Sequence, residues 1–227
     1  MDTKARHVAI ILDGNRRYAK KLLKEPWKGH DFGAEKVEKL FDWCKEFGVT
    51  ELTLYTFSLQ NFNRDKKEVE YLMNLFCKFF NSEKIKEKIR NNNIKMNFIG
   101  RIHLLPNKVQ EIITKIEEET KDYTGFTANF AMAYGGREEI IDGVNKLLKQ
   151  GMVEQVDEQV FSKYLQLQSE PDIIIRTGGE RRTSNFLVWQ SWYSEWFFVD
   201  KYWPEFEKED LVKVLEEFNQ RERRFGR

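Results

Sequence analysis

The chain alternates between short apolar runs and longer amphipathic segments. Five short runs read as strands, at residues 7–12, 51–57, 95–99, 127–133 and 172–176. Because amphipathic segments separate them, the pattern predicts an α/β fold, with a largely parallel central sheet flanked by helices. In such sheets ligands bind beyond the carboxyl ends of the strands, so the residues that follow each strand are the candidates for a binding site.

The segments between the strands repeat apolar residues at helical spacing. The five sets are Val37, Leu40, Phe41, Cys44 and Phe47; Val69, Leu72, Met73, Phe76, Phe79 and Phe80; Val109, Ile112, Ile113 and Ile116; Ile140, Ile141, Val144, Leu147 and Leu148; and Leu211, Val214, Leu215 and Phe218. The helix over 69–80 is unusually rich in large apolar groups. It fits either an ordinary core helix or the wall of an apolar tunnel, and the pattern alone leaves both open.

Length and charge narrow the class of protein. The 227 residues suit one domain of ordinary size, and 41% of them are hydrophobic, so we expect a single folded domain over 1–227. The 38 Lys and Arg residues balance 37 Asp and Glu residues. A net charge of +1 gives no basis for binding nucleic acid through bulk charge, although local basic clusters can bind phosphates.

Cysteines and apolar stretches bear on the compartment. Cys44 and Cys77 lie on apolar helical faces without metal-ligand spacing, which favours reduced core thiols in a cytoplasmic protein. The apolar run at 8–12 is too short for a signal peptide, and the longest uncharged stretch, 123–136, is too short to span a bilayer. We expect a soluble protein, with peripheral contact to a membrane left open.

A polar cluster follows the first predicted strand directly: Asp13, Gly14, Asn15, Arg16 and Arg17. Arginines offer paired N–H donors to phosphate oxygens, and backbone amides at a helix start favour anions. Asp13 alone is a poor phosphate ligand, but Mg²⁺ is commonly held by one or two carboxylates together with substrate phosphates. The cluster fits either a magnesium-bound diphosphate or a polar turn with a capping aspartate.

Two more strand ends carry polar residues. The loop after the second strand mixes polar and aromatic side chains, among them Ser58, Asn61, Phe62 and Arg64, and an ordinary turn gives the same pattern. The fifth strand runs into a glycine- and arginine-rich loop containing Arg176, Gly178, Gly179, Arg181, Arg182 and Ser184. Two anion sites at strand ends weaken the interpretation of either as a solvated loop. Glu195, the one acid in the aromatic stretch 189–198, is either a surface or a functional residue.

Common competing motifs are missing from the sequence. There is no Walker A loop and no G-x-G-x-x-G fingerprint, which argues against a nucleoside triphosphate or dinucleotide ligand. No H-E-x-x-H or paired C-x-x-C motif offers a metal site. The absence of any Asp-Asp pair excludes the aspartate-rich helix of the all-α isoprenoid synthases.

The ordered set of motifs resembles the cis-prenyltransferases, the undecaprenyl diphosphate synthase family. The motifs are HVAIILDGNRRYA from His7, GH at 29–30, LTLYTFS at 52–58, Asn61, Arg64, PDIIIRTGGE at 171–180, Arg182, SNFL at 184–187, WQ at 189–190, Glu195, WP at 203–204, and RERRFG at 221–226. The resemblance covers nearly the whole chain, and long motifs in a fixed order are highly specific. Arg16 and Tyr18 match the archaeal and eukaryotic branch. Departures from the family pattern are Gln60 for a common Glu, Phe62 for a Trp, and Pro26 for an Arg.

The resemblance implies a dimeric enzyme with a hydrophobic product tunnel. Such an enzyme lengthens farnesyl or geranylgeranyl diphosphate with isopentenyl diphosphate to a long cis-polyprenyl diphosphate. Asp13 would hold Mg²⁺ on the allylic diphosphate, Glu195 would help to place the metal of isopentenyl diphosphate, and Ser58 and Asn61 would lie near the reacting carbons. The other implied substrate contacts are Gly14, Asn15, Arg16, Arg17, Tyr18, His30, Phe62, Arg64, Arg176, Arg182, Ser184, and, reaching a neighbouring subunit, Arg224 and Gly226.

Two alternatives of other kinds stay open. A non-catalytic partner subunit, as in eukaryotic complexes, tends to lose the first-strand acid and the arginines, all of which are present here. A prenyltransferase that uses an alcohol as acceptor is chemically close and is only weakly opposed by the sequence. Product length, the choice of primer, the proton acceptor and membrane contact during product release are not determined by these residues.

Overall fold

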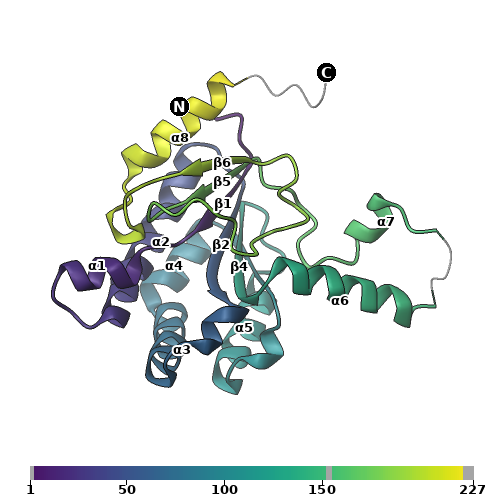
Figure 1. The fold of residues 1–227 in the computed structure, drawn as a ribbon, viewed down its shortest axis with the longest axis horizontal. Helices are drawn as coiled ribbons and strands as arrows, with labels where there is room; N and C mark the ends of the chain where they lie inside the picture. Colours follow the sequence, from purple (N-terminus) through teal and green to yellow (C-terminus); the bar gives the residue numbers. More distant parts are fainter. Residues whose placement is uncertain (1–2, 152–154, 222–227) are drawn as a thin grey trace.

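The computed structural model describes residues 3–151 and 155–221. Within these ranges a six-stranded sheet runs in the order β3-β4-β2-β1-β5-β6, and every neighbouring pair is parallel (Figure 1). The strands are β1 (His7–Ile11), β2 (Glu51–Ser58), β3 (Ile94–Ile99), β4 (Phe126–Tyr134), β5 (Ile173–Arg176) and β6 (Glu195–Phe198). The predicted parallel α/β fold is confirmed.

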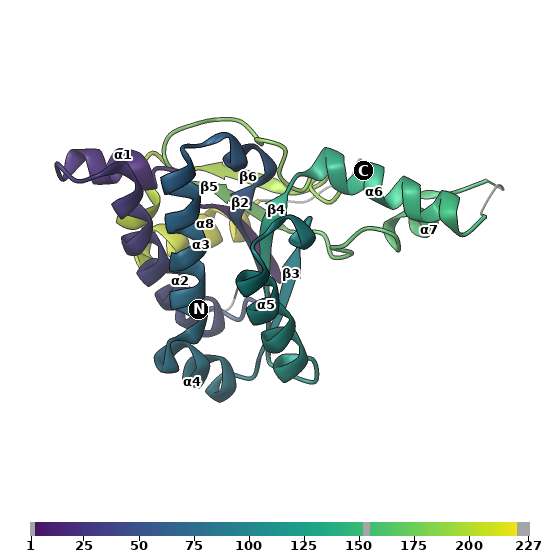
Figure 2. The same ribbon diagram turned by 90° about the horizontal axis from the view of Figure 1, so that it is seen from below.

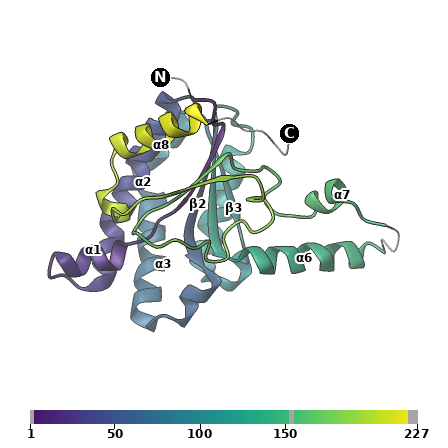
Figure 3. The same cartoon turned by 45° about the horizontal axis from the view of Figure 1, so that its top comes forward.

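Helices cover one face of this sheet. They are α2 (Gly29–Glu46), α3 (Lys66–Asn81), α4 (Glu83–Asn91), α5 (Asn107–Thr120) and α8 (Lys208–Gln220). Their apolar sides pack on Ile10, Leu54 and Phe130 among other strand residues and form the main core. Figure 2 shows α2, α3 and α5 beside one another, and Figure 3 shows α8 alongside α2. The central strands are also covered on the opposite face, and strands buried on both faces read as continuous apolar runs, which is why the sequence pattern identified them.

The opposite face of the sheet is covered mainly by irregular chain. Ala9, Tyr55 and Ile174 point to this side and pack against Phe186 and Leu187 in the segment between β5 and β6. Phe186 and Leu187 are fully buried. The glycine- and arginine-rich loop after β5 is therefore anchored on the sheet by the residues that follow it.

Two parts project at opposite ends of the molecule (Figures 1 and 2). One is α1 (Asn15–Lys21) with the turn after it, and the other is an arm of α6 (Gly136–Lys149) and α7 (Glu158–Ser162) with a small core of Leu147, Phe161 and Leu165. The helix predicted around 140–148 is confirmed. Its apolar side is only partly covered, because Ile141 is 57% exposed and Leu148 is 64% exposed.

The predicted strands agree with the structure to within one residue at each end. The short edge strand β6 is missing from the prediction, because its four residues form no alternating pattern that marks a strand. Cys44 and Cys77 are buried free thiols, as predicted. Among the described helices, none combines the length and the apolar character that a membrane crossing needs.

Candidate active site

Three adjacent strands end at one edge of the sheet, and polar residues follow each of them. β1 lies between β2 and β5, and all three run in the same direction. Asp13 follows β1, Ser58 ends β2, and Arg176 ends β5. Asp13 and Arg176 are 163 positions apart in the sequence, yet they meet at the carboxyl edge, where open α/β sheets bind ligands.

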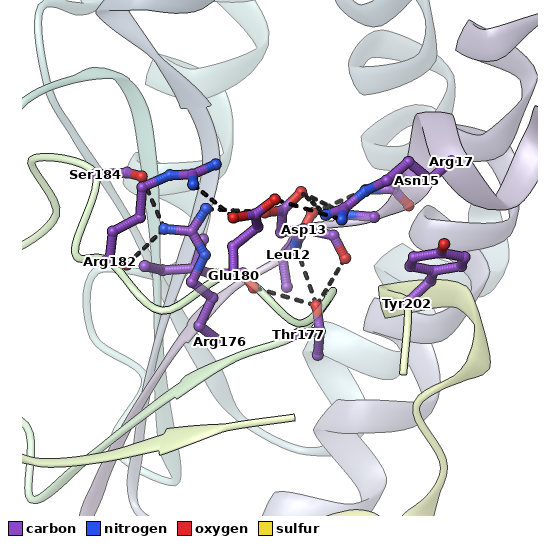
Figure 4. Close-up of polar contacts among 12 residues, drawn as sticks. Leu12, Asp13, Asn15, Arg17, Arg176, Thr177, Glu180, Arg182, Ser184 and Tyr202 are labelled. Carbon is purple, nitrogen blue, oxygen red and sulfur yellow. Dashed lines mark hydrogen bonds and ion pairs between the residues drawn. The ribbon is translucent and has the colours of Figure 1, made fainter. Parts of the chain in front are cut away.

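Asp13 lies at the centre of the contacts in Figure 4. Its Oδ1 accepts hydrogen bonds from the Gly14 N–H at 2.6 Å and from Arg17 Nη2 at 3.2 Å. Its Oδ2 accepts one from Arg176 Nη2 at 2.9 Å, and the Thr177 hydroxyl donates to the Asp13 carbonyl at 2.8 Å. One carboxylate therefore joins Arg17, which follows β1, to Arg176, the last residue of β5.

Two glycines allow neighbouring segments to approach the β1 turn closely: Gly14 makes room for Tyr202, which follows β6, and Gly178 brings the β5 loop against Asp13 and Arg17. Gly14 has a φ of 103° and Gly178 a φ of 89°, in the left-handed region that favours glycine. A Cβ on Gly14 would lie 2.7 Å from the Tyr202 ring, and one on Gly178 would lie 2.7 Å from Nη2 of Arg17. A side chain at Gly14 would push the β1 turn away from Tyr202, and one at Gly178 would displace the guanidinium of Arg17 from Asp13.

Arg176, Arg182 and Ser184 form what we call the second cradle. The Arg176 side chain is 4% exposed, and its Nη1 donates to the Ser184 hydroxyl at 2.7 Å and to the Arg182 carbonyl. Ser184 itself has a φ of 50°, a strained conformation that costs about 1–3 kcal/mol. Burial of the neighbouring Phe186 helps to hold this backbone in place.

The first cradle consists of Arg16, Arg17, His30 and Arg64, and its central carboxylate is Glu68. The Glu68 side chain is 3% exposed, and its Oε1 lies 3.0 Å from Arg64 Nη1, 3.6 Å from Arg16 Nε and 3.8 Å from His30 Nε2. Asp65 caps α3 by accepting a hydrogen bond from the Lys67 N–H, so Glu68 falls in the first turn of the helix.

Burial and charge set the protonation states around Glu68. His30 and the guanidinium groups of Arg64 and Arg16 lower the pKa of the Glu68 carboxyl, so it is ionised at neutral pH. Burial lowers the pKa of His30 below 6.5, although Glu68 opposes this shift, and the imidazole is therefore neutral. Sequence reasoning assigned Glu68 no role. The available signal was its position four residues after Arg64 and directly before the helix predicted over 69–80, a spacing that brings the two side chains together where the chain turns into a helix.

Glu180 connects the two cradles near the surface. Its Oε2 accepts a hydrogen bond from Arg182 at 2.6 Å, and its Oε1 lies 3.6 Å from Arg17 Nη1. Arg17 and Arg182 therefore face the same point rather than separate clefts (Figure 4). The Glu180 side chain is 38% exposed, and exposed ion pairs of this kind contribute little stability, so an incoming anion can replace it.

His30 and Arg64 of the first cradle and all three residues of the second line one cavity of about 700 Å³, whereas Arg16 and Arg17 are not among its lining residues. Its polar lining includes Asp13, Asn15, His30, Ser58, Gln60, Asn61, Arg64, Arg176, Arg182, Ser184 and Asn185. Its apolar lining includes Val37, Leu72, Met73, Leu75, Phe76, Phe79, Phe80, Phe130 and Met132. The helix with unusually many large apolar residues, α3, thus lines the cavity and also contributes to the core.

Three buried polar atoms at this site have no hydrogen-bond partner within the described part of the chain: Asn15 Oδ1, His30 Nε2 and Arg176 Nε. An unpaired buried polar atom is costly, and all three residues line the cavity. A polar ligand in the cavity can supply the missing partners.

Ser58 and Asn61 lie together between the cradles. The Asn61 Oδ1 accepts a hydrogen bond from the Ser58 N–H at 3.0 Å, as part of a capping box that begins a short 3₁₀ helix over Leu59–Asn63. This bond fixes the orientation of the Asn61 amide. Both residues line the cavity, and their place near the reacting carbons stays a prediction.

Other predicted site residues lie further from the cavity. Tyr18 packs edge-to-face on Phe32, with ring centroids 5.5 Å apart. Phe62 packs on Phe57 and lines a separate groove between α3 and α5. Arg224 and Gly226 are outside the described residues.

Glu195 is the first residue of β6 and so lies at the amino end of this strand, whereas the cavity lies at the carboxyl edge of the sheet. It pairs in register with Ile173, three residues before Arg176, which is roughly 10 Å back along the sheet. Its carboxylate accepts a hydrogen bond from Arg221 at 2.7 Å. Within the described chain, the structure does not bring Glu195 to Asp13.

The donor set around Asp13 fits Mg²⁺ bound together with a diphosphate. Among the described residues there is no group of three or more His, Cys, Asp or Glu side chains able to hold a metal ion. A single carboxylate, with phosphate oxygens and water as the other ligands, is the arrangement that Mg²⁺ commonly adopts. Asp13 supplies such a carboxylate at the edge of the cavity.

Known proteins resemble this chain over nearly its whole length. A relative from Pyrococcus abyssi, named tritrans,polycis-undecaprenyl-diphosphate synthase (geranylgeranyl-diphosphate specific), is 48% identical and the match covers 98% of this chain and 87% of the relative. A relative of the same name from Methanocaldococcus jannaschii is 45% identical, over 100% of this chain and 84% of the relative.

Solved structures give the same result. Lavandulyl diphosphate synthase from Lavandula x intermedia, in complex with dimethylallyl diphosphate, matches with a TM-score of 0.93 and 33% identity over 98% of each chain. A probable undecaprenyl diphosphate synthase from Campylobacter jejuni matches with a TM-score of 0.84 and 31% identity over 99% of each chain. The family model described as "Putative undecaprenyl diphosphate synthase" matches residues 11–226. The chain therefore belongs to the undecaprenyl diphosphate synthase family of prenyltransferases.

Proposed function

We propose that this protein condenses isopentenyl diphosphate with an allylic diphosphate and repeats the step to make a long-chain cis-polyprenyl diphosphate. The observation that carries the proposal is the meeting of two arginine cradles over one apolar cavity, with Asp13 in contact with both. Relatives at 42–48% identity are named geranylgeranyl-diphosphate specific, which favours geranylgeranyl over farnesyl diphosphate as the primer.

The first cradle would bind the allylic diphosphate, with Gly14 and Asn15 beside it. Breaking the allylic C1–O bond leaves the electron pair on the departing diphosphate. Arg16, Arg17 and Arg64 would stabilise that charge as it grows, which is where fixed donors accelerate a reaction most. Mg²⁺ on Asp13 would add charge neutralisation for the leaving group.

The second cradle would bind the diphosphate of isopentenyl diphosphate and direct its double bond at the allylic C1. Fixed orientation of two reactants contributes a large part of such a rate enhancement. The new C–C bond uses the electron pair of the isopentenyl double bond, and loss of a proton from the adduct forms the new double bond. The lengthened product carries the diphosphate of the isopentenyl unit, so this diphosphate would still be bound in the second cradle when the product forms.

The proton would go to a diphosphate oxygen. Ser58 and Asn61 would lie near the reacting carbons, but neither a hydroxyl nor an amide is a base at neutral pH. Gln60, which lines the cavity in place of an acid, is not a base either. Asn61, whose amide is held by the Ser58 N–H, would orient the diphosphate oxygen and the adduct for the proton transfer.

The apolar part of the cavity would receive the growing hydrocarbon. Phe76, Phe79 and Phe80 of α3 line it together with Phe130 of β4. A hydrocarbon chain gains from leaving water for such surroundings, which favours repeated lengthening over early release. Tyr18 and Phe62 would then support the site from behind rather than touch the diphosphates.

We also propose a homodimer, as the family resemblance implies. Ile141, Val144 and Leu148 lie on one side of α6 and are 39–64% exposed, so a second copy packed on the arm would cover them. Arg224, Gly226 and Glu195 keep their proposed roles towards isopentenyl diphosphate. For Glu195, an Ala substitution that changes neither the KM for this substrate nor kcat would exclude a role in the site.

A cytoplasmic location with peripheral contact to a membrane fits a product with a long hydrocarbon chain. The two alternative functions are weaker. A non-catalytic subunit has no use for Asp13, Arg176 and Arg182 held in contact around one cavity. An alcohol acceptor would leave the second, diphosphate-binding cradle without a ligand.

The test is a reaction of the purified chain with Mg²⁺, labelled isopentenyl diphosphate and one of three primers: geranyl, farnesyl or geranylgeranyl diphosphate. We expect label in long diphosphate products, formed fastest from geranylgeranyl diphosphate. Absence of product from the chain alone would support a partner subunit, and ether formation with an added alcohol would support the other acceptor.

A further inference from the structure

The turn between α1 and α2 exposes two leucines among lysines. Residues 20–28, which we call the basic tip, contain four lysines and one glutamate. Leu23 is 97% exposed and Leu22 is 41% exposed. The tip lies at one extreme end of the molecule, beside α1 in Figures 1 and 2. Its shape is that of a projection rather than a groove.

The exposed position of Leu23 is fixed by its backbone. The Leu23 N–H donates to the Lys20 carbonyl at 3.0 Å, and the Lys24 N–H donates to the Ala19 carbonyl at 3.0 Å. Leu23 has a φ of 56°, a left-handed conformation that suits Gly or Asn far better than leucine. Within the described chain, this leucine gains no burial in return for that strain.

Lysines surround these leucines on the tip. Lys20, Lys21, Lys24 and Lys28 are all exposed. Some of them have partners: Lys21 pairs with Glu205 at 2.7 Å, while the ammonium groups of Lys24 and Lys28 lie over aromatic rings. These contacts orient the lysines around the tip, and the positive charge outnumbers the single Glu25.

We propose that the basic tip docks on the surface of a bilayer that carries anionic lipids, with Leu22 and Leu23 inserted between headgroups. Lysines next to exposed apolar side chains form the arrangement that binds such interfaces. A protruding tip suits insertion better than docking on the flat surface of a protein. Neither leucine lines the cavity, so a substitution that weakens membrane binding should leave the rate of condensation unchanged.

The position of the tip also suggests how docking would assist release of the product, an argument that rests on the proposed function. The tip connects the last residues of the short helix α1 to the first turn of α2; α1 begins with Asn15 and the first turn of α2 carries His30, and both residues line the cavity. Docking would therefore bring the diphosphate end of the cavity close to the headgroup layer. A lipid diphosphate could pass to the bilayer there with its charged end at the level of the other headgroups.

The experiment is sedimentation of the full-length protein with vesicles, without substrates. Vesicles of a zwitterionic phospholipid alone are compared with vesicles that also contain an anionic phospholipid. We expect binding to the anionic vesicles. Leu23→Asn should weaken it about tenfold, because a leucine side chain no longer leaves water, and Lys24→Glu should weaken it by a similar factor.

The choice of asparagine keeps the variant folded. Asn adopts the left-handed conformation readily, so the thermal midpoint should not fall and turnover without vesicles should be unchanged. Leu104→Ser is the matched control, because Leu104 is 46% exposed but lies far along the chain, after β3. It should bind vesicles like the parent.

Three results would overturn the proposal: no binding of the parent to anionic vesicles, unchanged binding of Leu23→Asn, or equal loss in Leu104→Ser. Each of them leaves the condensation assay unaffected. Conversely, an inactive protein that still needs Leu23 to bind vesicles would disprove the proposed function and keep the docking.

Discussion

The two cradles use similar basic side chains but hold them in different ways. The first is organised around Glu68, whose side chain is 3% exposed and is shared by three basic groups. In the second, Arg176 is fixed by Asp13. Arg182 instead pairs with Glu180, whose side chain is 38% exposed and also reaches Arg17 of the first cradle. A buried carboxylate surrounded by partners fixes their geometry, whereas an exposed ion pair is readily exchanged.

This difference matches what each cradle would do in the proposed cycle. The lengthened product begins in the second cradle and must move to the first before the next condensation. A buried carboxylate, Glu68, in the first cradle and an exposed, exchangeable Arg182–Glu180 pair in the second would favour that direction of transfer. The predictions below test this contrast, from the largest expected effect to the smallest.

Asp13→Asn removes the charge that contacts both cradles and should reduce kcat about 1000-fold or more. Steady-state assays at saturating Mg²⁺ measure the effect. Stability should also fall, by about 1–3 kcal/mol in urea unfolding, because the Arg176 side chain is 4% exposed and loses its charged partner. A kcat within tenfold of the parent would exclude Asp13 from the reaction.

Glu68→Gln tests the buried carboxylate of the first cradle. Loss of the buried negative charge leaves Arg64 and Arg16 without their shared partner, and the free energy of unfolding should fall by about 3 kcal/mol. The KM for the allylic diphosphate should rise about tenfold, while that for isopentenyl diphosphate should change little. Equal changes in both KM values would show that the effect is a general loss of structure.

Acid should destabilise the first cradle. Burial lowers the pKa of His30 in the folded protein, so below about pH 6.5 the unfolded chain takes up a proton that the folded one does not. The free energy of unfolding therefore falls as the pH drops from about 7 through 6.5 towards the folded pKa.

His30→Gln provides the control for this pH dependence. Burial also lowers the pKa of His7, far from the site, so part of the dependence should remain in the variant. Urea midpoints at several pH values give the comparison. An identical pH dependence in parent and variant would mean that His30 is not held neutral.

Glu180→Gln is the matched substitution at the exposed carboxylate, and it should have the smallest effect on stability and on KM. Its exposed pairs with Arg182 and Arg17 should contribute less than about 1 kcal/mol of stability. The KM for isopentenyl diphosphate should change by no more than about threefold. A loss as large as that of Glu68→Gln would remove the contrast between the cradles.

The sequence predicted the parts of the site that follow from strand ends. Parallel strands place Asp13, Ser58 and Arg176 at one edge whatever their separation in sequence, so finding the strands was enough to find these residues. The central role of Glu68 could not be predicted in this way. Its burial depends on how α3 packs, and a glutamate four residues after an arginine is common on exposed helices.

Other features also depended on packing. The helix at 140–148 has an apolar side, but the pattern does not say whether the same chain covers it, and here Ile141 and Leu148 are exposed. Glu195 stands among aromatic residues, which suggested a site. Its register with Ile173 places Glu195 at the amino end of β6, whereas Arg176 is at the carboxyl end of the neighbouring strand β5. Only the pairing of β5 with β6 shows this.

The central claim is that the two cradles bind two diphosphates over one shared cavity. The most direct test is a crystal structure with isopentenyl diphosphate and an unreactive thio analogue of geranylgeranyl diphosphate bound together. We expect one diphosphate at His30 and Arg64, the other at Arg176, Arg182 and Ser184, and the hydrocarbon chain along α3. Diphosphates found in separate clefts, or a chain lying outside the α3 cavity, would contradict the account.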